Sequence, residues 1–293
     1  MTGAVRNAPE RPTPAIGELY DQVGGLVEQV MGGSLHYGYW HGADDSADMR
    51  EASERMTDLM VEKLGAHPGD RILDVGCGNG RPALRLASAS GASVLGVNIA
   101  PGQVATATGH AERESMADRV RFAVADAGNL RLTPGSFDGA WLFESLLHMP
   151  DERAVLRGIH AALRPGARLV IANLVLLAPL AEERVQQLRP LWQTFQIASI
   201  RPLASYQSLL DQCGFATAEI LDVTPNSVPR TMQTILGAQA GLRVEGLEEP
   251  LALVNWLAET TEAGYAIVVA VRRPDDASTR PPAQAAAEQA PAQ

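Results

Sequence analysis

The stretch RILDVGCGNG, residues 71–80, decides the fold, because an apolar run leads directly into three glycines with the spacing G-x-G-x-G. Glycines at such a strand-to-helix turn let the backbone approach a ligand closely and leave helix N–H groups directed at it. A dinucleotide fingerprint would have the spacing G-x-G-x-x-G, and a phosphate-binding P-loop would need Lys followed by Ser or Thr. Taken alone, the stretch fits either a nucleoside cofactor site or a glycine-rich structural turn.

Around this stretch, short apolar runs alternate with helical patterns. Alternation of strand and helix predicts parallel strands joined by right-handed crossovers, and so an α/β fold with a doubly wound, mostly parallel sheet of seven strands. In such a sheet, ligands bind at the carboxyl ends of the strands. The predicted strands cover residues 71–76, 93–98, 120–126, 137–143, 167–177, 214–224 and 264–273, and helices are predicted over 81–90, 101–116 and 151–166.

The composition suggests one catalytic domain with flanking segments. The ends are rich in Pro and poor in apolar residues, which predicts disorder over 1–15 and 274–293. Between them we expect a helical lid over 16–66, a cofactor-binding core over 67–180, a helical insertion over the substrate pocket at 181–216, and strands and helices that complete the sheet at 217–273.

The charge and the cysteines exclude several classes of partner. The chain has 293 residues and a formal net charge of -10, which disfavours binding to nucleic acid. Its two cysteines, Cys77 and Cys213, are far apart and have no Cys/His cluster around them, so neither a disulfide framework nor a metal site is expected. No apolar stretch is long enough to span a bilayer. The expectation is a cytoplasmic protein without membrane partners, with a homodimer as the candidate assembly.

The glycine stretch resembles a known sequence motif. ILDVGCGNG is similar to motif I of the class I S-adenosylmethionine (SAM)-dependent methyltransferases, and VRFAVADAGNL and LRPGARLVIAN resemble later motifs of that family in the same order. The resemblance implies that Asp74 holds the methionine ammonium while Gly76 and Gly78 line the methionine and ribose. It also implies that Asp126 bonds the adenine amino group, with Ala127 alongside. A carboxylate suits an ammonium group and ill suits a pyrophosphate, which favours SAM over NAD.

One position departs from the family pattern. At the end of the second predicted strand the family often has an acidic residue that accepts both ribose hydroxyls, and this chain has Asn98. An amide can accept one hydrogen bond and donate another, so a weaker ribose contact is expected, although Asn98 also fits a simple turn residue. Gln103, in the first turn of the next helix, matches a family position that lines the same cofactor.

Three further segments, SLHYGYW, FESLLHMPD and LVIANLVLLAP, resemble the small-molecule methyltransferases of bacterial antibiotic biosynthesis, which act on sugar and ansamycin hydroxyls. The resemblance implies a small natural-product substrate, with His148 as general base. His36 lies in a segment that folds over SAM in related enzymes, and it is a candidate cofactor contact or an aromatic-packing histidine.

Asn173 stands where those relatives carry Asp, so it can orient a substrate but cannot take a proton. Three functions therefore stay open. His148 acts alone on a hydroxyl, or the nucleophile is an amine that needs little general base, or the chain binds SAM without catalysis.

Overall fold

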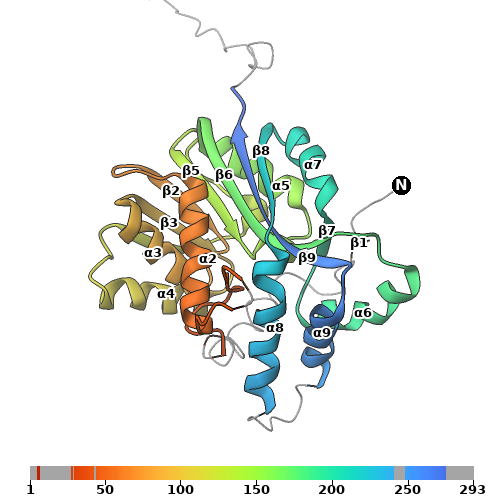
Figure 1. Cartoon of the computed structure of the whole chain (residues 1–293). Helices are drawn as coiled ribbons and strands as arrows, with labels where there is room; N and C mark the ends of the chain where they lie inside the picture. The colour runs from red at the N-terminus through yellow and green to blue at the C-terminus, as the bar shows by residue number, and fades with distance from the viewer. Residues whose placement is uncertain (1–4, 7–27, 29, 43, 241–247, 275–293) are drawn as a thin grey trace, which may run out of the picture.

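A central sheet with helices on both faces forms the frame of the protein, as a computed structural model shows (Figure 1). The structure describes residues 5–6, 28, 30–42, 44–240 and 248–274. The main path of the sheet runs β4-β3-β2-β5-β6-β9-β8, and its neighbouring strands are parallel except where β9 pairs with β6 and β8. The predicted α/β fold with a mostly parallel sheet is confirmed.

The seven strands of this path match the seven predicted runs closely. They are β2 (Arg71–Val75), β3 (Ser93–Asn98), β4 (Val120–Val124), β5 (Phe137–Phe143), β6 (Leu163–Leu176), β8 (Phe215–Asp222) and β9 (Ala263–Arg272). The apolar runs form strands because β2, β5, β9 and residues 169–176 of β6 are buried on both faces of the sheet, as the nearly continuous burial along them shows.

Two short strands extend the sheet beyond the prediction. β7 (Ser199–Pro202) pairs in parallel with the end of β6, and β1 (Val5–Arg6) pairs antiparallel with β7. The segment 181–216, expected to be helical, thus also contains a strand, and the segment 1–15, expected to be disordered, contributes two paired residues. β7 forms because Ile200 is fully buried in the core, a tertiary gain that outweighs local preference. Almost all the other residues of the two expected tails lie outside the described residues.

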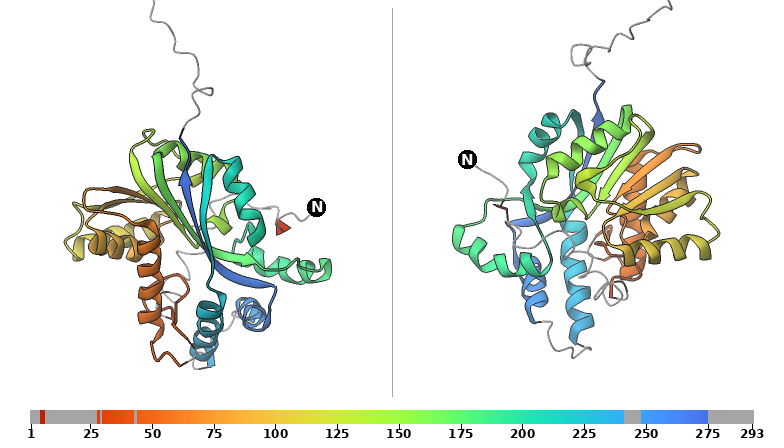
Figure 2. Two further views of the ribbon diagram at one scale, coloured as in Figure 1. Left: turned by 45° about the horizontal axis from the view of Figure 1, so that its top comes forward. Right: turned by 180° about the vertical axis from the view of Figure 1, so that it is seen from behind.

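The helices connect the strands and cover both faces of the sheet (Figure 2). They are α2 (Met49–Leu64), α3 (Arg81–Ser90), α4 (Pro101–Arg113), α5 (Glu152–Ala162), α6 (Glu182–Thr194), α7 (Tyr206–Gln212), α8 (Thr224–Ala240) and α9 (Glu248–Glu259). Short 3-10 turns are η1 (Ala127–Asn129), η2 (Leu146–His148) and η3 (Leu203–Ser205). α6, α8 and α9 gather beyond the end of the sheet at which β6 and β8 finish (Figure 1).

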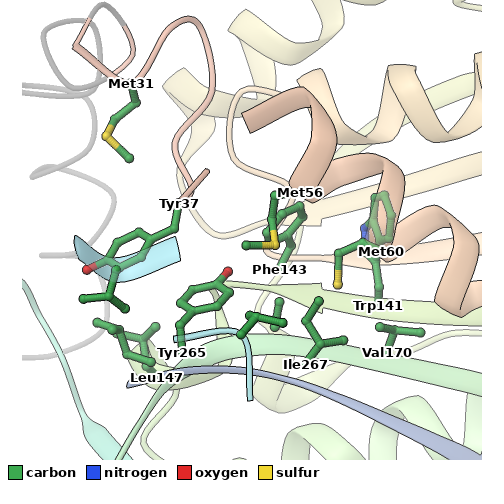
Figure 3. Close-up of a cluster of buried hydrophobic side chains, with 14 of the residues drawn as sticks. Met31, Tyr37, Met56, Met60, Trp141, Phe143, Leu147, Val170, Tyr265 and Ile267 are labelled. Atoms are coloured by element: carbon green, nitrogen blue, oxygen red, sulfur yellow. The ribbon is translucent and has the colours of Figure 1, made fainter. Parts of the chain in front are cut away.

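α2 packs on the sheet. Its sequence dictates sharp ends, because Asp48 and Glu51 form a reciprocal capping box and Gly65 ends the helix at φ +64°. Met56 and Met60 on its inner face are fully buried, and they lie against the side of the sheet that carries Trp141 (Figure 3). A lid was expected over 16–66, but α2 does not form one. Its apolar residues are buried against the sheet. Most of 16–30 lies outside the described residues.

The opposite face of the sheet is covered by α5 and α7. Leu156 and Ile159 of α5 share a buried cluster with Tyr206 and Leu210 of α7 and with Leu142 of β5. α7 was expected to cover the substrate pocket as part of the insertion at 181–216. That expectation is wrong for α7, which packs on the sheet because its own apolar residues are buried there.

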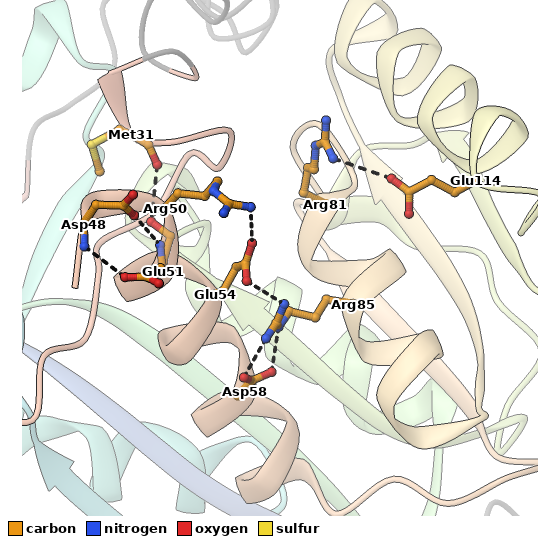
Figure 4. A network of polar contacts seen from close by, with 10 residues as sticks. Met31, Asp48, Arg50, Glu51, Glu54, Asp58, Arg81, Arg85 and Glu114 are labelled. Atoms are coloured by element: carbon orange, nitrogen blue, oxygen red, sulfur yellow. Dashed lines mark hydrogen bonds and ion pairs between the residues drawn. The ribbon is translucent and has the colours of Figure 1, made fainter.

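Polar contacts fix the layers in two different ways. On the surface, Arg85 of α3 bonds Asp58 at 2.6 and 2.7 Å and Glu54 at 3.1 Å, which links α3 to α2 (Figure 4). In the interior, Glu152 at the start of α5 accepts hydrogen bonds from Ser199 at 2.9 Å and from Nε of Arg201 at 3.0 Å. This buried ion pair joins α5 to β7.

Candidate active site

A cavity of about 310 Å³ opens at the carboxyl ends of β2, β3 and β5, in the size range of small-molecule sites. The loops that follow β2, β3, β4 and β5 supply most of its walls, as expected for a doubly wound sheet. Its lining includes all the predicted site residues except one, namely His36, Asp74, Gly76, Gly78, Asn98, Gln103, Asp126, Ala127 and His148.

The glycine loop is shaped by close packing as well as by backbone geometry. Gly76 has φ +83°, and a Cβ added there would collide with the side chain of Ser145, which is itself held by a 2.6 Å hydrogen bond to the Val75 carbonyl. Gly80 has φ +79° and its Cβ would meet the Phe122 ring at 2.5 Å. Gly76 therefore brings the backbone to the cavity, whereas Gly80 lets α3 pack closely on the sheet.

Asp74 is a buried carboxylate in the wall of the cavity. Its side chain is 2% exposed, and burial raises its pKa to about 7, while the indole of Trp141, its register partner on β5, acts in the opposite direction. None of the described residues that line the cavity is Lys or Arg. A ligand that brings an ammonium group would supply the cation that this carboxylate lacks.

The amide side chains of Asn98 and Gln103 form a pair at the end of β3. Asn98 Nδ2 donates to Gln103 Oε1 at 2.8 Å, and Asn98 Oδ1 accepts from the Ala100 N–H at 3.0 Å. Asn98 is thus both the turn residue and a lining residue, two descriptions that the sequence left open. Its contact with a ribose stays a prediction.

Asp126 and Ala127 lie at the edge of the cavity after β4. Asp126 caps the η1 turn, since its Oδ1 accepts from the Gly128 N–H at 2.8 Å. One carboxylate oxygen thereby fixes the side chain at the cavity. The expected contact with an adenine amino group is compatible with this placement and stays a prediction.

His36 is packed tightly. Its ring stacks on Phe143 with centroids 4.0 Å apart, its Nδ1 lies 3.0 Å from the Tyr37 carbonyl, and its Nε2 lies 3.2 Å from the Thr57 hydroxyl. Burial lowers its pKa to about 4, so the ring is neutral at physiological pH. The aromatic-packing role is present, and cofactor contact stays a prediction because the residue also lines the cavity.

His148 lies in η2, directly after β5. Its Nδ1 is 3.1 Å from the carbonyl of Gln196, and because a carbonyl only accepts, Nδ1 carries the proton. In the neutral ring this places the lone pair on Nε2. Burial lowers the pKa of His148, which favours that neutral form. The ring is therefore in the state that a general base needs.

Asn173 is not at the cavity. It is 3% exposed on β6, and its amide donates to the Tyr206 hydroxyl at 3.4 Å. Ile171 and Val175 share its side of the strand and belong to the cluster around α5 and α7. Asn173 is therefore not among the lining residues of the cavity, and its predicted contact with an acceptor stays a prediction.

Glu144 is a cavity residue whose partners were not evident in the sequence. Its Oε1 accepts hydrogen bonds from the Tyr37 N–H and from the Tyr265 hydroxyl, both at 2.7 Å. Burial raises its pKa to about 7. Tyr265 is 121 residues away in the chain, and only the insertion of β9 beside β6 brings it here. The local sequence FES, residues 143–145, does not indicate this partner.

The described residues contain neither a metal-binding group of side chains nor a membrane-spanning helix. No group of three or more His, Cys, Asp or Glu in the described ranges has the arrangement of a metal site. Among the same residues, no helix is both long and apolar enough to cross a membrane.

The chain is similar to several known proteins. Residues 66–224 match a family described as a methyltransferase domain. The 27-O-demethylrifamycin SV methyltransferase of Amycolatopsis mediterranei is 36% identical over 275 residues, covering 90% of this chain and 99% of the relative. The (+)-O-methylkolavelool synthase of Herpetosiphon aurantiacus is 34% identical, covering 82% and 84%.

Among solved structures, the cyclase SpnF superposes with a TM-score of 0.77 at 28% identity, covering 91% of this chain and 99% of that one.

Proposed function

This chain belongs to the SAM-dependent methyltransferases, and from that premise we propose that it methylates a hydroxyl of a small secondary metabolite, with His148 as general base. Two relatives are named for products or substrates of O-methylation, which supports oxygen as the accepting atom. The observation that carries the proposal is the hydrogen bond from His148 to the Gln196 carbonyl, which sets the tautomer of a histidine in the cavity.

The residues of the cavity fit SAM. Asp74 would hold the ammonium group, because its buried carboxylate has no Lys or Arg near it among the lining residues that the structure describes. The Asn98 and Gln103 pair would face the ribose, and Asp126 would face the adenine. When bound, SAM supplies a methyl group on a positively charged sulfur, which an oxygen nucleophile can attack in line.

The chain's own residues have two tasks in that reaction. The cavity walls must orient the acceptor, and a base must remove the hydroxyl proton as the new bond forms. Nε2 of His148 is suited to take that proton because Nδ1 already carries one and donates it to the Gln196 carbonyl. The same bond holds the ring in place and stabilises the imidazolium that results. The proton then leaves to solvent after release of the product.

The test is direct methyl transfer. The full chain is incubated with SAM and 27-O-demethylrifamycin SV, together with a panel of hydroxyl-bearing and amine-bearing natural products, and S-adenosylhomocysteine and methylated products are measured by mass spectrometry. Methylation at oxygen is expected. Methylation restricted to amines would replace the proposal by N-methylation, and SAM binding without any turnover would favour a binding protein. Because SpnF is named a cyclase, turnover must be observed and not assumed.

A further inference from the structure

Glu144 is held in an unusual backbone conformation at the point where β5 ends. Its φ is +50°, a left-handed value that is uncommon for residues other than Gly and that persists where surrounding contacts fix it. Those contacts are present. The backbone N–H of Glu144 donates to the Ala172 carbonyl at 2.8 Å, and its Oε1 is bonded by Tyr37 and Tyr265. The left-handed turn thus directs the carboxylate toward the cavity.

The described residues hold only one of the two carboxylate oxygens of Glu144. Both hydrogen bonds that the side chain receives end on Oε1, and within the described residues Oε2 has no hydrogen-bonding partner. The two tyrosine rings stack with centroids 5.1 Å apart, so they act as one rigid support. Since a carboxylate has about four lone-pair positions, Glu144 keeps acceptor capacity on the oxygen that the tyrosines do not hold.

The described groups around this carboxylate do not offer it a cation. Tyr37 from the N-terminal segment and Tyr265 from β9 both stay protonated, because burial and the negative charge of Glu144 raise the pKa of each phenol. His36 is neutral, and burial lowers the pKa of His148. The described lining contains four carboxylate residues, Asp74, Asp126, Glu144 and Asp151, and neither Lys nor Arg. An anion entering this cavity meets like charge, whereas a hydroxyl or an ammonium meets a hydrogen-bond acceptor.

We propose that Glu144 binds the methyl acceptor, with Oε2 accepting a hydrogen bond from its hydroxyl or ammonium group, so that the site takes neutral and cationic acceptors and rejects anionic ones. The inference rests on the proposed function in assigning the cavity beside His148 to the acceptor. It goes further in two ways. It defines the acceptor by its charge, and it names Glu144 as a second residue that contacts the acceptor. His148 takes the proton, and Glu144 fixes the direction from which the acceptor approaches.

The test measures binding and does not need the natural acceptor. The full chain is saturated with S-adenosylhomocysteine at about pH 8, where Glu144 is ionised. Three probes of one shape are then titrated by calorimetry or ligand-observed NMR, namely cyclohexylammonium, cyclohexanol and cyclohexanecarboxylate. The ammonium probe is expected to bind about tenfold or more tightly than the carboxylate, the effect of one charge-assisted hydrogen bond, with the alcohol between them.

Two variants make the test specific. Glu144→Gln keeps an oxygen that can accept from both tyrosines but presents an amide NH₂ group in place of Oε2, so the preference for ammonium should disappear while affinity for S-adenosylhomocysteine changes less than about twofold. Asp151→Asn is the matched control, because Asp151 lines the same cavity and caps α5 through the Ala154 N–H, and Asn caps equally well. This variant should keep the preference.

The proposal is overturned if the carboxylate probe binds as well as the ammonium probe, if no probe binds, or if Glu144→Gln retains the preference. Loss of the preference in Asp151→Asn to the same extent would also overturn it. The preference would then come from the total negative charge of the cavity and not from Glu144. A failure to observe methyl transfer would count against the proposed function alone, since these affinities are measured without turnover.

Discussion

Acidification should weaken SAM binding through Asp74. This carboxylate is buried in the wall of the cavity, and burial raises its pKa to about 7. The ammonium of SAM can pair with the carboxylate but not with the protonated acid. Affinity should therefore fall as the pH drops below about 7. It should also fall above about pH 8, because an α-amino group loses its proton there. The expected profile is a maximum between these two values.

The size of the acid limb follows from the pKa. With a value of about 7, roughly three in four Asp74 side chains are ionised at about pH 7.5 and roughly one in eleven at about pH 6, so the dissociation constant should rise roughly eightfold. Calorimetry in two buffers of different ionisation enthalpy would measure both the affinity and the proton released. At about pH 6 nearly one proton should be released for each SAM bound.

Two variants separate Asp74 from its neighbour. Glu144 also has a pKa raised to about 7 and lines the same cavity, so its titration must be told apart. Asp74→Asn should lose the acid limb and bind SAM about tenfold to a hundredfold more weakly at about pH 7.5. Glu144→Gln should keep the acid limb. An affinity that is constant between about pH 6 and 7.5 in the unaltered protein would refute this reasoning.

Three other predictions concern the base, the stability profile and the buried ion pair. His148→Ala should lower kcat by about two to four orders of magnitude in a methyl-transfer assay, with little change in SAM affinity; near-normal turnover would exclude His148 as the base. Because Asp74 titrates higher in the folded state than in the unfolded state, its stabilisation is complete below about pH 4 and is lost as the pH rises to about 7. Asp74→Asn should then raise the free energy of unfolding of the cofactor-free protein at pH 8 by about 1–3 kcal/mol in denaturant titration, and no gain would contradict it. Glu152→Gln should cost about 3–5 kcal/mol because it leaves Arg201 buried without its partner. Arg85→Met on the surface should cost less than about 1 kcal/mol by the same measurement, and equal losses would show that burial does not set the scale.

The sequence predicts the parts of the fold that depend on local pattern. SVLGVN and FDGAWLF have the bounds of β3 and β5, because apolar and β-branched runs bounded by turns define a strand. The positions of the glycine loop and Asp74 at the end of β2 follow from the sequence for the same reason, since strand, turn and helix follow one another directly.

The errors arise where the partner of a segment decides its role. The apolar stripe of α2 is visible in the sequence, but the sequence does not say whether the sheet or a ligand covers it. The contact of Asn173 with Tyr206 depends on how α7 packs on the sheet, which the sequence does not state. The sequence does not reveal the partners of Glu144, because Tyr37 and Tyr265, which hold it, come from opposite ends of the described chain.

β9 comes after every other described strand in the sequence and yet lies between β6 and β8. Its pairing with β6 joins Arg168 to Val271 and Leu176 to Ala263, so the sheet contains contacts of very large sequence separation. Such contacts form late and slowly. Closing the long loop between the two strands costs conformational entropy before the contacts can stabilise the sheet. Until β9 enters, β6 and β8 each present an unpaired edge, the situation in which strands associate with other molecules. Tyr265 lies on β9 as well, so Glu144 gains its second hydrogen bond only when β9 has paired with β6.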